Sequence, residues 1–284
     1  MGRRICVIGG DMRQLTLAEY LVKDGFDVSI FGFDTSPLIT PSESLTEALK
    51  GCKTVILGIN PCSENMNIST PLWSDSISAQ TVANHISPGS TIIGGKISTN
   101  FVSLCSEKNI NCVDYIIRED FSILNAVPTA EGAIEIAMQE LPVTLHSCNC
   151  LVTGFGRIGK ILARDLSFLG ATVTCSARKS GDIAWINALG YNCVHTKNLS
   201  EQVHNFTVIF NTVPFCIFNR EVLRNLRPGT LIIDLASKPG GVDLDSASKL
   251  GIKVIWALSL PGKVAPATAG KIIKDSVLNI LNEM

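Results

Sequence analysis

Three closely spaced glycines constrain the fold of this chain more than any other feature. They lie in the run Gly154-Phe155-Gly156-Arg157-Ile158-Gly159, which follows the apolar segment 149–153 and opens a stretch of helical spacing at 158–168. In this strand-turn-helix context the first two glycines allow a tight turn with bare peptide N–H groups, and the third allows close helix-to-strand packing. The run predicts a loop that binds the pyrophosphate of a dinucleotide at a helix N-terminus. The alternative is a glycine turn in an unrelated α/β unit.

The apolar segments predict two α/β domains. The 284 residues are enough for two domains, and 46% hydrophobic against 17% charged residues provide for large cores. Short apolar runs bounded by Gly, Pro, Asn or Asp are typical of parallel strands buried on both faces. Such runs lie at 4–8, 28–31, 54–59, 91–93, 112–116, 149–154, 171–177, 191–195, 207–213, 230–236 and 252–258. We therefore expect an α/β protein with two doubly wound parallel sheets and a cleft between them, the second sheet belonging to a Rossmann domain.

We expect a substrate-binding, catalytic domain at residues 1–127 and a dinucleotide-binding domain with a connecting helix at residues 128–284. The stretch 265–284 has apolar residues at helical spacing and is expected to pack back on the first domain. The run Val127-Pro128-Thr129 predicts the start of the connecting helix. The polar segment 60–76 is longer than most α/β connections and is either a lid or substrate loop, or a plain surface excursion.

Charge and composition exclude several classes of partner. The formal net charge is −1 and no block of Lys and Arg occurs, so nucleic acid is not expected. No segment approaches the roughly 18 apolar residues of a membrane span, and the apolar run near the N-terminus is too short for a signal sequence. We expect a cytoplasmic protein. The ten cysteines are scattered without a C-x-x-C pair, which indicates buried free thiols and no metal site.

The second strand of the predicted Rossmann domain bears on the choice of dinucleotide. An Asp or Glu at its end would bind a free ribose 2′-hydroxyl, whereas this strand reaches Ser176 and is followed by Arg178-Lys179-Ser180. Two cations and hydroxyl groups suit a 2′-phosphate, which favours NADP over NAD. The alternative is that Arg178 and Lys179 are solvated loop charges and NAD is also accepted.

Two later strands of this domain end in candidate cofactor and substrate contacts. The residues expected beside the nicotinamide half of the cofactor are Asn211, Thr212, Val213, Pro214, Leu235 and Ala236. Ser237 and Lys238 follow and are candidates for binding a substrate carboxylate, or else they only shape the loop before Gly240.

The first domain also has a glycine turn, Gly9-Gly10-Asp11, but it lacks the third glycine and its Asp11 would repel phosphate. Arg13 at the start of the following helix suits a smaller anion such as a substrate carboxylate. The alternative is that Arg13 pairs with Asp11 or another nearby acid. The four histidines, at 85, 146, 195 and 204, lie away from the carboxyl ends of the later strands of the second sheet, which argues against a simple 2-hydroxy acid dehydrogenase.

Several motifs together resemble those of the dipicolinate synthase A-subunit family of endospore-forming bacteria, over nearly the whole chain. They are Val7-Ile8-Gly9-Gly10-Asp11 with Arg13-Gln14, Val127-Pro128-Thr129-Ala130-Glu131-Gly132, Gly154-Phe155-Gly156-Arg157, Asp234-Leu235-Ala236-Ser237-Lys238-Pro239-Gly240-Gly241, and Leu260-Pro261-Gly262-Lys263-Val264-Ala265-Pro266 with Thr268-Ala269-Gly270. Where the family has Arg after Ala-Ser, this chain has Lys238, so a bidentate carboxylate contact is not expected there.

The resemblance implies oxidation of dihydrodipicolinate, or of its hydrated precursor from the lysine pathway, with NADP or NAD, in the mother cell during sporulation. It also implies a flavoprotein-like partner, the B subunit, and we expect a homo-oligomer. Aromatisation of the ring drives such a reaction, so the protein need only align the ring and hold two carboxylates. Arg13, Thr129, Ser237 and Lys238 are the candidates for this, and Glu131 or solvent would take the proton.

Two other functions remain open from the sequence. One is an NADP-dependent dehydrogenase or reductase of another 2-oxo or 2-imino acid. The other is a non-catalytic dinucleotide-binding scaffold for the B subunit.

Overall fold

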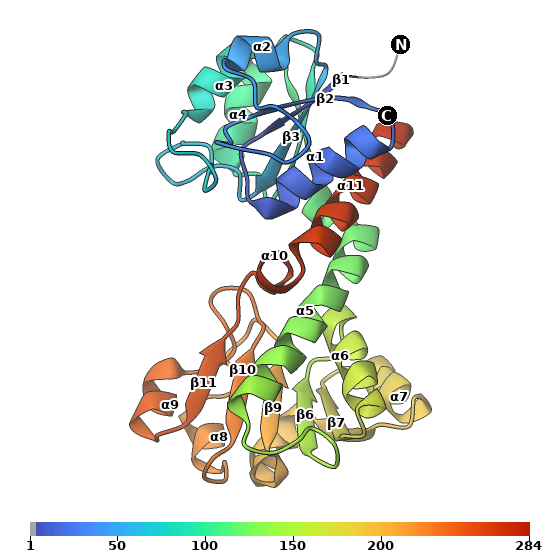
Figure 1. Cartoon of the computed structure of the whole chain (residues 1–284). Coiled ribbons are helices and arrows are strands. Elements are labelled where there is room, and N and C mark those ends of the chain that lie inside the picture. The colour runs from blue at the N-terminus through green and yellow to red at the C-terminus, as the bar shows by residue number, and fades with distance from the viewer. Residues whose placement is uncertain (1–3) are drawn as a thin grey trace. The chain divides into compact units, whose positions relative to one another are not determined.

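The computed structural model describes residues 4–284. They divide into two compact units. The first unit contains the chain up to Leu124 together with Ala265–Met284, and the second contains Asn125–Val264 (Figure 1). Each unit has its own parallel sheet.

Unit 1 is built on a parallel sheet of five strands in the order β2-β1-β3-β4-β5. Its strands are β1 (Arg4–Ile8), β2 (Asp27–Phe31), β3 (Thr54–Ile59), β4 (Thr91–Gly95) and β5 (Asn111–Asp114). Side chains alternate between the two faces of a strand, so Val55 and Leu57 of β3 enter one core while Ile56 enters the other. The near-continuous apolar runs of the sequence therefore serve two cores at once.

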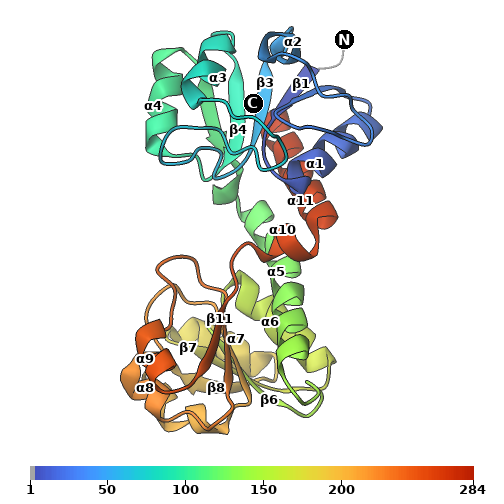
Figure 2. The same ribbon diagram turned by 60° about the vertical axis from the view of Figure 1, so that its left-hand side comes forward.

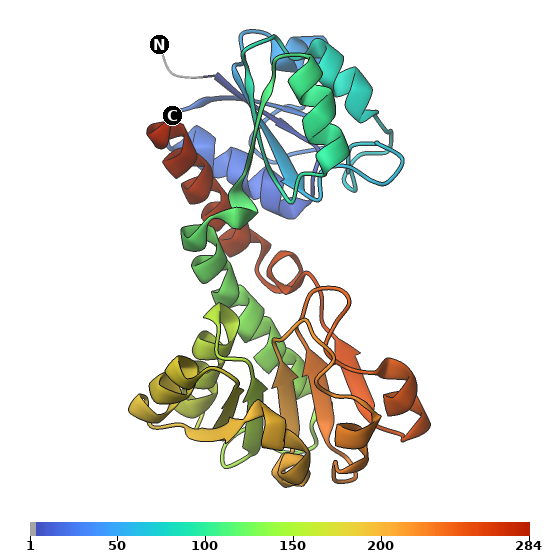
Figure 3. The same ribbon diagram turned by 180° about the vertical axis from the view of Figure 1, so that it is seen from behind.

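Helices cover both faces of this sheet. The core that holds Val55 lies under α2 (Leu45–Leu49), α3 (Ala79–His85) and α4 (Thr99–Glu107), which Figure 2 shows beside the sheet. The opposite core lies under α1 (Met12–Lys23) and the final helix α11 (Pro266–Glu283), which run side by side (Figure 3). The C-terminal helix is thus an integral part of unit 1.

The packing of α11 on α1 is close and is joined by an ion pair. The Lys274 ammonium, whose side chain is 10% exposed, donates to the Asp24 carboxylate at 2.6 Å. A Cβ atom at Gly270 would lie 2.6 Å from the Arg13 carbonyl oxygen, so the two helices approach within a distance that only glycine permits.

Unit 2 has a parallel sheet of six strands in the order β11-β10-β9-β6-β7-β8. Its strands are β6 (Asn149–Thr153), β7 (Thr172–Ala177), β8 (Asn192–His195), β9 (Val208–Asn211), β10 (Leu231–Asp234) and β11 (Lys253–Trp256). This is the strand order of a Rossmann domain, and the expected fold class of two doubly wound parallel sheets is confirmed. β7 and β8 end at the predicted residues, whereas β6, β9, β10 and β11 end one or two residues before the predicted end, because the chain turns there into loops.

Two helical layers enclose this second sheet. On one face lie α5 (Glu119–Glu140), α6 (Arg157–Phe168) and α7 (Ser180–Ala188). On the other face lie the 3₁₀ turns Thr196–Glu201 and Val203–Asn205, α8 (Arg220–Arg224) and α9 (Leu244–Lys249). The short helix α10 (Leu260–Val264) precedes α11 and packs on the first of these faces through Leu260.

The prediction of a helix start at Val127-Pro128-Thr129 was wrong. The helix α5 begins at Glu119 and Pro128 lies inside it. Two acidic residues in its first turn, Glu119 and Asp120, suit a helix N-terminus. Proline lacks the N–H that would bond one turn back, but burial of apolar side chains before and after it holds the helix. The predicted strand 112–116 is likewise shorter, because a 3₁₀ turn, Tyr115–Ile117, follows β5.

The polar segment 60–76 is an ordered excursion that packs against the carboxyl end of β1. The Gly10 N–H donates to the Ser69 carbonyl at 2.8 Å, and the Ser74 N–H and hydroxyl both donate to Asp34. The Trp73 ring meets Phe31 edge-on at 5.1 Å. The segment therefore covers the first glycine turn with its own backbone.

The cysteines are free thiols, as expected, but not all are buried. Cys216 is exposed, and Cys62, Cys112 and Cys193 are half-buried. Among residues 4–284, no cluster of three or more His, Cys, Asp or Glu side chains is arranged to hold a metal ion. None of the helices in that part of the chain has the length and apolarity needed to cross a bilayer.

We predict that Gly270→Ala destabilises unit 1, because the new methyl group would meet the Arg13 carbonyl oxygen at 2.6 Å and push α11 from α1. We expect the free energy of unfolding in urea, followed by circular dichroism, to fall by about 1–3 kcal/mol. Gly181→Ala is the matched control, since a Cβ there meets nothing within 4 Å and α7 should gain up to about 1 kcal/mol. Equal effects of the two changes would contradict the close approach.

Candidate dinucleotide site

The glycine run after β6 has the geometry that the sequence predicts. Gly154 has a φ of +87°, and its N–H donates to the Ser176 carbonyl of β7 at 2.9 Å. A Cβ atom at Gly154 would lie 2.5 Å from the Thr212 hydroxyl oxygen, and one at Gly159 would lie 2.1 Å from the Gly154 carbonyl oxygen. Neither position can hold a larger residue without moving the backbone.

Gly156 serves a different purpose from the other two glycines. It caps α6 without a side-chain hydrogen bond, and a Cβ atom there would meet nothing within 4 Å. No side chain at position 156 therefore stands between the start of α6 and a ligand. A helix N-terminus attracts an anion, because its first N–H groups and the helix dipole both favour negative charge. The loop fits a pyrophosphate.

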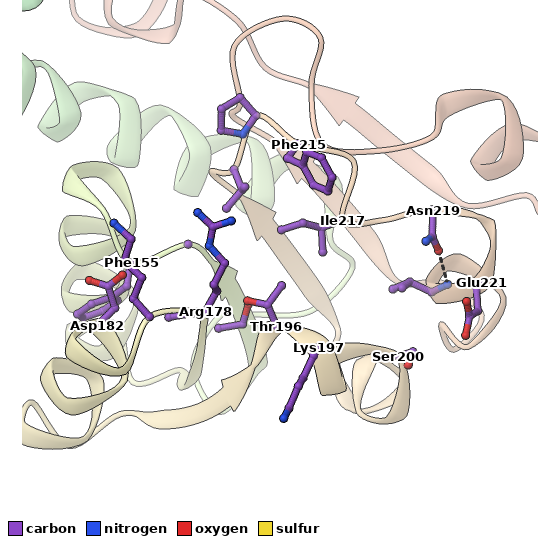
Figure 4. A pocket seen from close by; sticks show the side chains of 17 residues that line it. Phe155, Arg178, Asp182, Thr196, Lys197, Ser200, Phe215, Ile217, Asn219 and Glu221 are labelled. Atoms are coloured by element: carbon purple, nitrogen blue, oxygen red, sulfur yellow. Dashed lines mark hydrogen bonds between the residues drawn. The ribbon is translucent and has the colours of Figure 1, made fainter.

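A cavity of about 730 Å³ opens beside this loop (Figure 4). Its walls come from the glycine loop and from the carboxyl ends of β7, β8 and β9. The lining residues are Gly154, Phe155, Ser176, Ala177, Arg178, Lys179, Asp182, Thr196, Lys197, Ser200, Val213, Pro214, Phe215, Ile217, Asn219, Glu221 and Val222. Its size and mixed apolar and polar lining suit an adenosine moiety.

Several polar groups of this cavity could bind the ribose end of a dinucleotide. Arg178 and Lys179 line it, and Figure 4 shows the Arg178 side chain directed into the space between Phe155 and Ile217. Ser176 is fully buried, and its hydroxyl has no hydrogen-bond partner among the described residues. An orphaned buried hydroxyl at this wall is the kind of group that a ligand oxygen would satisfy. Ser180, by contrast, begins α7 and does not line the cavity.

Asn211 was predicted to contact the cofactor, but its side chain forms hydrogen bonds within the protein instead. Its amide nitrogen donates to Asp234 at 2.8 Å and to the Val213 carbonyl at 3.0 Å. Its amide oxygen accepts from the Thr153 hydroxyl at 2.6 Å and from the Val213 N–H at 3.2 Å. All of its hydrogen-bonding groups are occupied, so Asn211 orients the loop after β9 and does not reach a ligand.

The three residues after Asn211 divide between the protein and the cavity. The Thr212 hydroxyl donates to the Thr153 carbonyl at 2.8 Å and supports the glycine loop from below. Val213 and Pro214 line the cavity. The loop after β9 therefore offers a ligand mainly apolar contact.

Asp234, at the end of β10, is the acceptor on which the Asn211 network converges. It is 2% exposed and accepts from Asn211, from the Ala236 N–H at 3.1 Å and from the Gly241 N–H at 2.8 Å. The sequence pattern did not indicate this role, although an acid directly after a three-residue apolar run was the available signal. Leu235 and Ala236 are buried beside it and do not line the cavity.

The remaining candidates of unit 2 lie in four different surroundings. Ser237 and Lys238 are in the turn that the Gly240 N–H closes onto the Ser237 carbonyl, at the surface of the unit. Thr129 donates its hydroxyl to the Asn125 carbonyl one helical turn back. Glu131 lies on a separate groove between α5 and α6 and does not line the cavity beside the glycine loop. Arg157 and Ile158 begin α6 without lining that cavity.

In unit 1 the alternative for Arg13 is the arrangement observed. Its guanidinium donates to both carboxylate oxygens of Asp11, with Nε–Oδ1 at 2.9 Å and Nη2–Oδ2 at 2.7 Å. Burial raises the pKa of Asp11, but hydrogen bonds and charge from Arg13 outweigh it and hold that pKa below its usual value. Because Ser69 also occupies the Gly10 N–H, this turn is closed to a pyrophosphate.

The cavity also contains residues that the sequence did not nominate. Thr196, Lys197, Ser200, Phe215, Ile217 and Asn219 line it, as do the acids Asp182 and Glu221. All of these residues follow β7, β8 or β9. Their position after the ends of these strands was the only sequence feature that could have identified them as cavity residues. Asp182 is the most informative, since it brings a carboxylate to the wall that holds Arg178 and Lys179.

Comparison with known proteins identifies the family. The model of the N-terminal domain of the dipicolinate synthase A subunit matches residues 4–116. The A subunit of dipicolinate synthase from Bacillus subtilis (strain 168) is 34% identical, over 100% of this chain and 97% of the relative. This chain belongs to the dipicolinate synthase A-subunit family. A crystal structure of the family member from Bacillus halodurans matches with a TM-score of 0.91 at 32% identity, over 99% of this chain and 98% of the other.

The fold of this member of the dipicolinate synthase A-subunit family extends beyond the family. L-Alanine dehydrogenase superposes with a TM-score of 0.70 at 13% identity, over 98% of this chain and 88% of that one. At this identity the likeness concerns the fold alone. The two-unit α/β architecture is therefore shared with a dehydrogenase.

We predict that Asn211→Ala destabilises unit 2, because the Asp234 carboxylate and the Thr153 hydroxyl would each lose a buried partner. We expect a loss of about 2–3 kcal/mol in the free energy of unfolding. Asn149→Ala at the exposed start of β6 is the control, for which we expect a change within about 0.5 kcal/mol. Thermal melting of both variants checks the prediction, and an unchanged melting temperature for Asn211→Ala would contradict it.

Proposed function

We propose that this chain is an oxidoreductase that forms dipicolinate by oxidising dihydrodipicolinate or its hydrated precursor, with NADP, or less favourably NAD, as the acceptor. The observation that carries the proposal is the glycine loop after β6, in which Gly154 and Gly159 are sterically required and Gly156 leaves the start of α6 open. Membership of the dipicolinate synthase A-subunit family supplies the substrate class.

The reaction removes two hydrogens from the dihydropyridine ring. A ring carbon gives up its hydrogen with both electrons as hydride, the ring loses one proton, and the remaining electrons complete the aromatic system. A nicotinamide dinucleotide held by the glycine loop after β6 would supply the hydride acceptor. The gain in aromatic stabilisation means that the protein needs no strong base, which fits the location of the four histidines. Since Glu131 lies on a different groove, we propose that solvent accepts the proton.

The chain's own contribution is to bind and orient two anionic molecules. We propose that the α6 N-terminus binds the pyrophosphate, and that Arg178, Lys179 and the orphaned Ser176 hydroxyl bind the 2′-phosphate of NADP. Lys238 and Ser237 follow β10 at the carboxyl edge of the same sheet and are proposed to bind a substrate carboxylate. Arg13 is proposed to bind the second carboxylate through the edge of its guanidinium that Asp11 does not use.

The Bacillus subtilis relative is named as a lettered subunit of its enzyme, which supports the proposal of a second chain. We propose that a flavoprotein-like B subunit joins this chain and raises its activity, and that the complex works in the cytoplasm of the mother cell. The purified chain should be assayed with and without the B subunit, with dihydrodipicolinate made in situ and with 2-oxo and 2-imino acids as competitors. Reduced cofactor and near-ultraviolet product absorbance should rise together with dihydrodipicolinate only. Hydride transfer from neither substrate class would overturn the proposal in favour of a scaffold.

We predict that Arg178→Ala weakens binding of NADP more than that of NAD, because only NADP carries the phosphate that this guanidinium would bind. Loss of one charge-assisted contact of about 1.5–3 kcal/mol corresponds to a roughly tenfold to hundredfold rise in the NADP dissociation constant. Titration calorimetry with both dinucleotides measures this. Arg220→Ala is the control, since Arg220 is exposed at the start of α8 and outside the cavity lining. Equal weakening of both dinucleotides would remove Arg178 from the 2′-phosphate site.

We predict that Arg13→Ala impairs turnover without changing cofactor affinity, because Arg13 lies in unit 1 and the glycine loop lies in unit 2. We expect kcat/KM for dihydrodipicolinate to fall about tenfold or more, with the NADP dissociation constant unchanged. Steady-state kinetics and calorimetry on the same preparation give both values. Unchanged kinetics would show that Arg13 only caps α1 with Asp11.

A further inference from the structure

The loop between β9 and α8 carries a large aromatic side chain that the protein leaves uncovered. Phe215 is 73% exposed, whereas Phe218 in the same loop is fully buried in the core under α8 and α9. The fold therefore depends on Phe218 and gains little from Phe215. Because an exposed phenyl ring keeps a large apolar surface in water, a ligand that covered Phe215 would gain binding free energy.

Hydrogen bonds hold this loop in place at both ends. The Val213 N–H and carbonyl are bonded to the Asn211 side chain at 3.2 and 3.0 Å. The Phe218 N–H and carbonyl are each bonded at 3.0 Å to the backbone of the loop after β10. Between these anchors the Ile217 N–H donates to the Phe215 carbonyl at 2.7 Å, which closes a tight turn. The position of the Phe215 backbone is thus set by the protein itself.

Phe215 faces the dinucleotide cavity together with a second apolar side chain. Both Phe215 and Ile217 line that cavity, whereas the exposed Cys216 between them does not. In Figure 4 these two side chains lie on one side of the space into which Arg178 is directed, and Phe155 lies on the other. The loop after β9 therefore offers an apolar wall to a ligand in this cavity.

The strand order indicates which half of a dinucleotide would meet this wall. The cavity is lined by residues that follow β7, β8 and β9, whereas Leu235 and Ala236 after β10 do not line it. Since β6 lies between β9 and β7, the start of α6 lies between the two halves of the carboxyl edge. A pyrophosphate there would direct the adenosine half toward β7 and β8. The base that enters the cavity is therefore adenine.

The charges around the cavity do not account for binding of a neutral base. Its lining includes three cations and two acids, namely Arg178, Lys179 and Lys197 with Asp182 and Glu221. The net positive charge suits phosphates, but adenine is uncharged and flat, so apolar and aromatic surface has to bind it. Phe155 is the other aromatic residue of the lining and is only 4% exposed, so Phe215 offers the larger free ring surface.

We propose that Phe215 binds the adenine ring of the dinucleotide by stacking, with Ile217 in contact beside it. This inference rests on the proposed function, because it requires a dinucleotide at the start of α6. Stacking on the base is independent of the ribose 2′ substituent, so Phe215 supplies affinity that NADP and NAD share. Arg178 supplies the preference between them. The cavity thus separates affinity for the base from discrimination at the ribose.

The test is titration calorimetry of the full chain with NADP and with NAD, in which Phe215→Ala is compared with Phe168→Ala. Phe168 is 83% exposed and lies outside the cavity. We expect Phe215→Ala to raise both dissociation constants by the same factor, about fivefold to thirtyfold, which corresponds to about 1–2 kcal/mol of base stacking. We expect no change for Phe168→Ala. Unchanged dissociation constants for Phe215→Ala, or weakening of NADP alone, would overturn the proposal.

Two further variants separate stacking from a structural role. Phe215→Trp keeps an aromatic face and should bind both dinucleotides at least as tightly as the unchanged chain. The fluorescence of the added indole should fall on titration with adenosine 2′,5′-bisphosphate, which contains the adenine but no nicotinamide. Phe215→Leu keeps apolar bulk without a ring and should bind more weakly than Phe215→Trp. If Phe215→Trp bound as weakly as Phe215→Ala, or its fluorescence did not respond, stacking would be wrong.

The same titrations distinguish failure of this inference from failure of the proposed function. If the unchanged chain bound neither dinucleotide, both would be wrong. If the unchanged chain and Phe215→Ala bound both dinucleotides equally well, only the role of Phe215 would be wrong. If Phe215→Ala kept its dinucleotide affinity but lost binding of the B subunit, the exposed ring would belong to that partner and the adenine contact would be excluded.

Discussion

The approach of α6 to the end of β6 is the contact on which the site depends. An added Cβ at Gly159 would fall 2.1 Å from the Gly154 carbonyl oxygen, so the helix can start at this point only if the residue is glycine. That contact places the N-terminus of α6 directly after the glycine loop, at the carboxyl end of β6. The loops opposite are held by a second constraint, since Asn211 and Asp234 tie the ends of β9 and β10 together below them. A rigid loop facing a buried polar network is a preorganised anion site, which is why binding there would cost little conformational entropy.

The glycine turn of unit 1 also lies at the carboxyl end of a parallel strand, but its N–H groups are bonded within the protein. Gly9 and Gly10 both have positive φ, as a turn after a parallel strand requires, yet the Ser69 carbonyl accepts from the Gly10 N–H. The Asp11 carboxylate caps α1, so the positive end of that helix is already neutralised. Two similar sheets thus differ at the helix that follows their first strand. In unit 1 the Ser69 carbonyl and the Asp11 carboxylate close the helix N-terminus, whereas in unit 2 it is open. Only the open one fits a pyrophosphate.

The sequence predicted the strands and the glycine loop well because both depend on local patterns. Buried parallel strands such as β3 are apolar on both faces, and the spacing of Gly154, Gly156 and Gly159 has a steric cause that acts within a few residues. Prediction failed where long-range packing decides. Pro128 has the local properties of a helix start, but apolar contacts on either side of it carry α5 through. Asn211 has the right place for a cofactor contact, but a distant acid, Asp234, takes its amide. Glu131 likewise follows a suggestive motif, and only the orientation of α5 places it on another groove.

The electrostatics of the cavity wall set how strongly a 2′-phosphate would be favoured there. Arg178 and Lys179 supply positive charge, while Asp182 in the first turn of α7 supplies a carboxylate to the same wall. An acid in the first turn stabilises a helix, so Asp182 serves α7 at the expense of phosphate binding. Lys179 and Asp182 are solvent-accessible, so without a direct hydrogen bond to the phosphate each contributes on the order of 1 kcal/mol and the two contributions partly cancel. The net preference for a 2′-phosphate over a free hydroxyl therefore depends on a single guanidinium. Arg178 is directed into the cavity and is the group in position to provide it.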